Sequence, residues 1–228
     1  MYSCFVNWTC AKLILRLLRV EWQTMHLGHN PAIPNIIFAF DLTGELLMSP
    51  EETLTLWNEQ LDAVVKKMKA GGGKAGLATP EMLAGKTGLE VIQAMMTGEL
   101  PYPHIADTLE FSLVEVEAGK AVFQGIPQLK HYNPLGTVHG GWYATLLDSA
   151  MGCAVQTMLP VGRTYTTAEL SINIVRAASL KTGSLRAIGS VIHCGRQLAT
   201  AEARIVAPDG RLYAHATTTC LVLEAAQS

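Results

Sequence analysis

The chain has 228 residues and a mass of 24.6 kDa, enough for one core or for a compact domain with an appendage. Hydrophobic residues make up 49% of it, charged residues 16%, and the formal net charge is -2. No basic field is therefore available to hold a polyanion, and a nucleic-acid partner is not expected.

The cysteines, the histidines and the hydropathy indicate the cellular compartment and the kinds of site to expect. The five cysteines are odd in number and form no C-x-x-C pair, which predicts a reducing, cytoplasmic compartment without a disulfide framework or zinc site. His26, His29 and His104 have no ligand-like spacing with one another, so no metal site is predicted. No apolar run is long enough to span a bilayer, and no membrane partner is predicted.

Residues 1–48 show no sustained period, and the string GHNPAIPN interrupts any helix or strand that would cross it. We therefore expect a weakly ordered N-terminal extension. The segment CAKLILRLLRVEW (residues 10–22) has two interpretations: a basic amphipathic helix on a membrane surface, or an upstream translation artefact or poorly ordered extension. We favour the second, because Met48, followed by SPEET, looks like a more natural beginning for a cytoplasmic protein.

Residues 49–86 are predicted to form a helical extension followed by a glycine-rich linker. Ser49 as N-cap, Pro50 at the first helical position and Glu52 as capping-box partner mark the start of a helix. The helix continues to about Lys69. The following AGGGKAG (residues 70–76) is typical of a flexible joint.

The remaining residues, 87–228, are predicted to form the main domain. A second capping box, Thr87 with Glu90, opens a helix that Gly98 ends. A long helix, apolar on all sides, is predicted over residues 138–159. Alternating patterns predict strands over residues 106–117, 120–127, 165–176, 184–193, 197–207 and 211–223. One buried helix among antiparallel strands implies an α+β fold, a curved antiparallel sheet wrapped around a long central helix.

An aspartate, Asp148, lies in the middle of this apolar helix. A helix that is apolar all round is a buried helix, and an ionised carboxylate inside it costs several kcal/mol unless something compensates. The flanking residues offer no nearby cation. A chemical task for Asp148 is therefore favoured over the alternative, a structural acid that caps or bridges strands.

The strings NPLGTVHGGWYATLLDSAMG and YTTAELSINIVRAA, around this aspartate, resemble the hotdog-fold acyl-CoA thioesterases of the phenylacetate-degradation (PaaI-like) type. The resemblance covers roughly residues 87–224. It implies that Asp148 is the general base or nucleophile and that the Gly140 N–H polarises the thioester carbonyl. It further implies that His139 and Asn133 shape the site and orient substrate or water, and that Thr167 positions the attacking water.

The resemblance also implies a hotdog fold and no cofactor, because coenzyme A is part of the acyl-CoA substrate. It implies a homodimer or homotetramer whose active sites are shared between chains. Distance along the helix points the same way. Asp148 follows Gly140 by eight residues, which is about 12 Å of helix and a turn of about 80°. One thioester cannot touch both in a single chain, so a two-fold dimer would bring them together.

Elementary chemistry agrees with these roles. Thioester hydrolysis places negative charge on the carbonyl oxygen, which the free N–H groups of a helix N-terminus stabilise. Gly140 and Gly141 lack a Cβ and let an acyl group approach the backbone closely. A carboxylate in an apolar wall can take a proton from water or attack directly, since a thiolate leaves with little acid assistance.

Several alternatives stay open at this stage. The fold could carry a hydratase or dehydratase acting on enoyl-CoA, or a non-catalytic acyl-CoA-binding sensor or scaffold. Trp142 and Tyr143 either border an acyl pocket or belong to the core, and Glu169 is expected to be solvated or at an interface. Five basic residues are candidates for the coenzyme A phosphates, with none singled out: Arg163, Arg176, Lys181, Arg196 and Arg204.

Overall fold

The computed structural model describes residues 21–24, 37–40 and 46–225, which cluster into two compact units, Met1–Thr53 and Leu54–Ser228. In the first unit, β1 (Glu21–Thr24), β2 (Ile37–Phe40) and β3 (Leu46–Leu47) pair antiparallel in the order β1-β2-β3. The sequence did not predict these strands, because they are short and carry no alternating pattern. Most of the segment with two interpretations, residues 10–20, lies outside the described residues.

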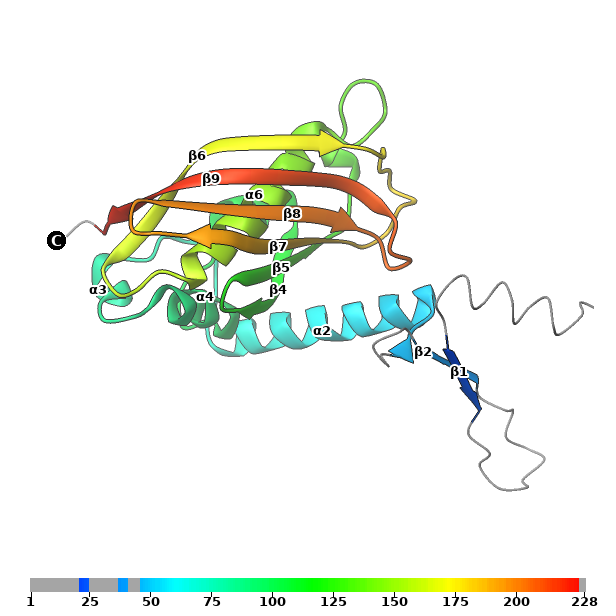
Figure 1. Ribbon diagram of the computed structural model, residues 1–228, viewed down its shortest axis with the longest axis horizontal. Helices are drawn as coiled ribbons and strands as arrows, with labels where there is room; N and C mark the ends of the chain where they lie inside the picture. The colour runs from blue at the N-terminus through cyan, green and yellow to red at the C-terminus, as the bar shows by residue number, and fades with distance from the viewer. Residues whose placement is uncertain (1–20, 25–36, 41–45, 226–228) are drawn as a thin grey trace, which may run out of the picture. The chain divides into compact units, whose positions relative to one another are not determined.

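The second unit is built on a six-stranded antiparallel sheet (Figure 1). Its order across the sheet is β4-β5-β7-β8-β9-β6, so the last four strands of the chain occupy neighbouring positions. The strands are β4 (Phe111–Glu117), β5 (Lys120–Gly125), β6 (Arg163–Ile174), β7 (Leu185–Cys194), β8 (Leu198–Val206) and β9 (Leu212–Glu224). The four predicted strands after residue 160 are therefore confirmed, with boundaries within about two residues.

The predicted buried helix is α6 (Gly140–Thr157), which lies against the sheet (Figure 1). Alanines are frequent among the buried strand residues of the core, and their small side chains let the helix approach closely. At Gly189 on β7 the approach is close, because a Cβ there would lie 2.4 Å from the Ala150 carbonyl oxygen. The core therefore runs along α6, and the α+β arrangement that the sequence predicts is confirmed.

Five helical segments accompany the sheet and α6: α2 (Pro50–Ala70), α3 (Pro80–Leu83), α4 (Gly88–Thr97), α5 (His104–Leu109) and the 3-10 turn η1 (Leu129–His131). Both predicted capping boxes are present. The Ser49 and Glu52 pair starts α2, and Thr87 and Glu90 start α4, which ends at Gly98 with φ 79°. The short α3 was not predicted.

The α2 helix is held against the sheet by Trp57, its one buried residue. The Arg186 guanidinium lies 4.5 Å from the centre of the Trp57 ring and donates a 3.2 Å hydrogen bond to the Trp57 carbonyl. It also donates to the Gln124 side chain at 2.9 Å. Burial lowers the pKa of Arg186 to about 10. These contacts join a helix that precedes the main domain in sequence to the central strands.

One prediction in this region is wrong. The strand predicted from residue 106 begins only at Phe111, because residues 104–109 form α5, which ends at Glu110 with φ 53°. The flexible joint over residues 70–76 stays a prediction. At its start, a Cβ at Gly71 would lie 2.0 Å from the Thr97 carbonyl oxygen, and Gly73 donates a hydrogen bond to the Met68 carbonyl.

Candidate functional site

The loop before α6 is held by Asn133. Its side-chain oxygen accepts hydrogen bonds from the Leu135 and Thr137 N–H groups at 2.9 and 3.2 Å, and its amide donates to the Thr137 hydroxyl at 2.9 Å. Its own backbone N–H donates to the Thr137 carbonyl at 2.8 Å. Within this chain Asn133 therefore fixes the shape of the loop that leads into the helix.

His139 caps the start of α6. Its Nδ1 accepts a 2.9 Å hydrogen bond from the Gly141 N–H, so that donor is already used. Among the described residues, no hydrogen bond involves the Gly140 N–H. The histidine is exposed, and a Cβ at Gly140 would meet only the end of the Ile174 side chain, at 3.3 Å. Of the two glycine N–H groups considered from the sequence, Gly140 is the one available to a ligand.

Asp148 lies in the middle of α6, half-buried, and accepts a 3.0 Å hydrogen bond from the Thr167 hydroxyl of β6. A β-bulge interrupts the β6–β9 register directly after Thr167, and the Thr218 hydroxyl donates to the Glu169 carbonyl at 2.7 Å. Bulges re-aim neighbouring side chains, and this one accompanies a threonine that faces the helix. Glu169 itself is exposed.

The five predicted site residues therefore form two groups in one chain. Asn133, His139 and Gly140 lie at the beginning of α6, whereas Asp148 and Thr167 meet in its middle. The helix rise separates the groups by about 12 Å. The contact between Asp148 and Thr167 is the one long-range pairing of predicted site residues found within the described chain.

Two residues beside Asp148 were not predicted from the sequence. Tyr165 lies over Gly152, one helical turn after Asp148, where a Cβ would be 2.1 Å from the tyrosine hydroxyl. Burial, with the nearby Cys153 and Asp148, raises the pKa of Tyr165 well above its ordinary value. Burial and the Asp148 charge raise the pKa of the Cys153 thiol to about 12. A glycine four residues after the aspartate was the available sequence signal.

Trp142 and Tyr143, which the sequence left as candidates for the border of an acyl pocket, belong to the core. Both side chains are buried, and their polar atoms form hydrogen bonds within the chain. The indole donates to the Leu109 carbonyl, and the Tyr143 hydroxyl accepts from the Ala178 N–H at 2.6 Å. Throughout the residues that the structure describes, no group of three or more metal-binding side chains is present, and no helix is long and apolar enough to cross a membrane.

Two of the basic residues considered for the coenzyme A phosphates, Arg176 and Arg163, lie at opposite ends of β6. Arg176 follows β6 and lies 5.9 Å from the centre of the Tyr213 ring, beside the residues that contact the start of α6. Arg163, at the opposite end of β6, donates to the Arg196 carbonyl at 2.6 Å. Only the Arg176 end of β6 is near the free Gly140 N–H.

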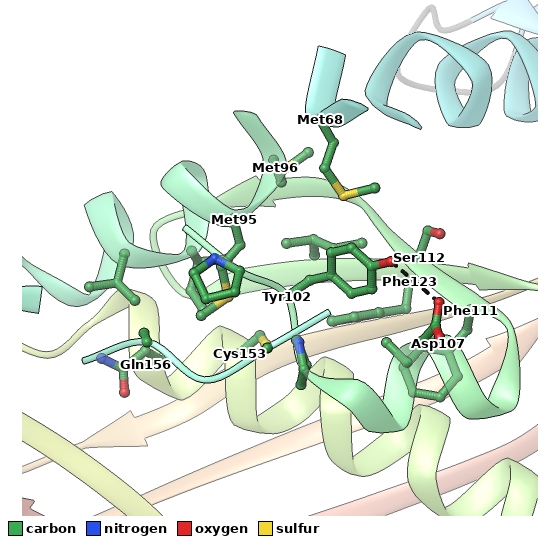
Figure 2. Close-up of a pocket in the computed structure, with 18 of the residues that line it drawn as sticks. Met68, Met95, Met96, Tyr102, Asp107, Phe111, Ser112, Phe123, Cys153 and Gln156 are labelled. Atoms are coloured by element: carbon green, nitrogen blue, oxygen red, sulfur yellow. Dashed lines mark hydrogen bonds between the residues drawn. The ribbon is translucent and has the colours of Figure 1, made fainter. Parts of the chain in front are cut away.

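A cavity of about 640 Å³ lies beside α6 (Figure 2). Its wall is mostly apolar and includes none of the five predicted site residues. The candidate acid and this cavity are therefore different places, although Tyr165 and Cys153, the neighbours of Asp148, both line the cavity.

Comparison with known proteins places this geometry among thioesterases. The sequence profile of the thioesterase superfamily matches residues 135–214, a range that includes His139, Gly140, Asp148 and Thr167. A Ralstonia eutropha structure, described as a candidate thioesterase related to phenylacetic acid degradation, is 30% identical with a TM-score of 0.52. That match covers 57% of this chain and 97% of the other.

Two further relatives are similar. A conserved Pseudomonas aeruginosa protein of known structure is 27% identical with a TM-score of 0.50, over 54% of this chain and 95% of the other. A curated relative from Halobacterium salinarum, named as a candidate esterase, is 40% identical over 75 residues, or 32% of this chain. The match spans 48% of that relative, about half its length.

Proposed function

Since this chain belongs to the hotdog-fold thioesterase family, we propose that it hydrolyses acyl-CoA thioesters to a free acid and coenzyme A. The observation that carries the proposal is the half-buried Asp148 carboxylate, which Thr167 holds at 3.0 Å on a helix whose first N–H is unused. Coenzyme A enters and leaves as part of the substrate, and no separate cofactor is needed.

The reaction follows from these groups. Asp148 removes a proton from water as the water oxygen attacks the carbonyl carbon, or attacks that carbon itself and is later released by water. The carbonyl oxygen gains negative charge and is stabilised by the Gly140 N–H at the positive end of the helix dipole. The carbon–sulfur bond then breaks and the thiolate of coenzyme A leaves. The proton that Asp148 took from the attacking water neutralises the thiolate, which returns Asp148 to its carboxylate form.

A complete site requires a second copy of the chain. Gly140 and Asp148 are about 12 Å apart along α6, so the two groups acting on one carbonyl come from different chains. β6 supports this arrangement because it is the last strand of the sheet and has 12 residues. A long open strand edge is a ready site for pairing. We therefore propose a homodimer, or a homotetramer made of two dimers, with shared active sites.

The activity is tested with Asp148→Asn, which keeps the shape of the side chain but removes its basicity. Release of coenzyme A from a panel of acyl-CoAs is followed with a thiol reagent. We expect hydrolysis by the parent protein and a loss of about 100-fold or more in the variant. Asp62→Asn, the same change at an exposed position on α2, is the matched control and should retain activity. A parent inactive on every thioester, or an active Asp148→Asn, would contradict the proposal.

The shared site is tested by complementation. Asp148→Ala and Gly140→Val are each expected to be inactive alone, and to regain activity when co-expressed. A mixed dimer holds one site with both lesions and one with neither, and random assortment makes about half of the dimers mixed. The two single variants must each remain folded and dimeric. If verified mixed dimers then showed no more activity than either single variant, the site would lie within one chain.

A further inference from the structure

The cavity beside α6 is built largely by residues that precede the thioesterase profile. The match begins at residue 135, whereas α2, α4 and β4 end before it. Only Cys153, Gln156, Thr164 and Tyr165 of the lining come from the matched range. The cavity is thus lined mainly by residues outside the profile match, and its size falls in the ordinary range of ligand sites.

The lining has the character of an apolar ligand site. Figure 2 shows Met68 and Met95 reaching into the cavity from α2 and α4. Methionine side chains are flexible and polarisable, so they adapt to chains of varied shape. The polar side chains labelled in Figure 2 are Ser112, Gln156 and the pair Tyr102 and Asp107, which a 3.3 Å hydrogen bond joins.

The cavity connects structurally to the candidate acid through Tyr165. The tyrosine lines the cavity, and its hydroxyl lies over Gly152 of α6. Gly152 follows Asp148 by four residues, which places it on the same face about 6 Å further along the helix. Tyr165 and Cys153 are therefore the side chains that an acyl chain would pass on its way from a carbonyl group at Asp148 into the cavity.

We propose that this cavity receives the apolar acyl chain of the thioester substrate, and that α2 and α4 select substrates with medium or long chains. The inference rests on the proposed hydrolase function. It assigns a specificity role to Met68 and Met95, which lie outside the matched family range. Short acyl groups reach Asp148 without entering the cavity, so their hydrolysis does not depend on these residues.

The test fills the cavity with a larger side chain. Met95→Trp places an indole in the lining from α4, and Met68→Trp does so independently from α2. Met82→Trp is the matched control, because Met82 is 46% exposed on α3 and does not line the cavity. Each variant is assayed with butyryl-CoA and dodecanoyl-CoA. Binding of cis-parinaric acid, a fluorescent fatty acid, is measured separately in the Asp148→Asn background.

We expect each filled variant to lower kcat/KM for dodecanoyl-CoA about tenfold or more, with butyryl-CoA changed less than about twofold. Both should weaken parinaric acid binding to a similar degree, and Met82→Trp should change neither. The inference fails if a folded Met95→Trp or Met68→Trp keeps the parental ratio of dodecanoyl to butyryl activity.

The binding measurement separates this inference from the proposed function. If the parent hydrolyses no thioester, the proposed function is wrong. Parinaric acid binding that both filled variants lose then still establishes the cavity as an acyl-chain site. Binding that is absent in the parent or unchanged in both filled variants overturns the inference, whether or not the protein is a thioesterase.

Discussion

Gly152→Ala is expected to destabilise the protein, although alanine is the better helix former. Alanine in a helix interior gains about 1 kcal/mol over glycine. Here the new Cβ would lie 2.1 Å from the Tyr165 hydroxyl oxygen and 2.8 Å from the ring carbon that carries it. Overpacking of this kind costs about 1–3 kcal/mol. The free energy of unfolding should therefore fall by about 0–2 kcal/mol instead of rising.

Urea unfolding of Gly152→Ala, Tyr165→Phe and the double variant measures this contact. Removing the hydroxyl deletes the closest atom, so the double variant should be more stable than the sum of the single effects predicts, by about 1 kcal/mol. A rise of about 1 kcal/mol in Gly152→Ala, with additive effects in the double variant, would mean that the tyrosine does not rest on this glycine.

Three further outcomes are expected. Burial lowers the pKa of His131 below its ordinary 6.5. As the pH decreases from 6.5, the free energy of unfolding should therefore decrease, by at most about 1.4 kcal/mol per pH unit. His131→Gln should show a smaller decrease. Thr167→Val should lower kcat about tenfold or more by freeing Asp148, and Thr167→Ser should restore most of it. Trp57→Ala should cost about 3 kcal/mol and increase proteolysis within α2, whereas Leu56→Ala, at an exposed position, should do neither.

Each of these outcomes has a clear contrary result. The folded protein binds a proton at His131 less readily than the unfolded chain, so this contribution is complete above pH 6.5 and is lost as the pH falls. Equal pH dependence in His131→Gln would assign the effect to other groups. A Thr167→Val variant as fast as the parent protein would mean that the hydroxyl does not act, and a Thr167→Ser variant as slow as Thr167→Val would mean that a hydroxyl at this position is not sufficient. An α2 equally resistant to protease in Trp57→Ala would mean that other contacts hold the helix.

Local signals in the sequence predicted much of this fold. The capping boxes at Ser49 and Thr87 and the alternation of the last four strands depend on neighbours in the chain, and each was confirmed. The start of the strand expected from residue 106 was wrong, because residues 104–109 form α5 and Glu110 is left-handed. An alternating pattern over so few residues does not distinguish a short helix from a strand.

The candidate site divides in the same way. The motif placed Gly140 and Asp148 on one helix, and the expected nearness of Thr167 agrees with its hydrogen bond to Asp148. The catalytic roles themselves stay predictions. The cavity could not be predicted, because its lining comes from residues 64–165 and no single segment of the sequence carries its pattern.

The order of features along α6 leads to a last prediction about the shared site. Gly140 begins the helix, Asp148 lies in its middle, and Cys153 and Gln156 beyond it line the cavity. Asp148 and its neighbouring cavity thus belong to one chain, whereas in the shared site that we propose the Gly140 N–H acting on the same thioester would come from the partner. Chain-length selection should therefore follow the chain that supplies Asp148.

The complementing pair of variants can show which chain selects. In a mixed dimer, the intact site takes Asp148 from the Gly140→Val chain and Gly140 from the Asp148→Ala chain. Met95→Trp added to the Gly140→Val chain should reduce dodecanoyl-CoA hydrolysis about tenfold relative to butyryl-CoA. The same change added to the Asp148→Ala chain should have no effect, because its cavity adjoins the dead site. The reverse pattern would place the acyl chain in the partner's cavity, and equal effects from both chains would mean that Met95 acts on the fold and not on the substrate.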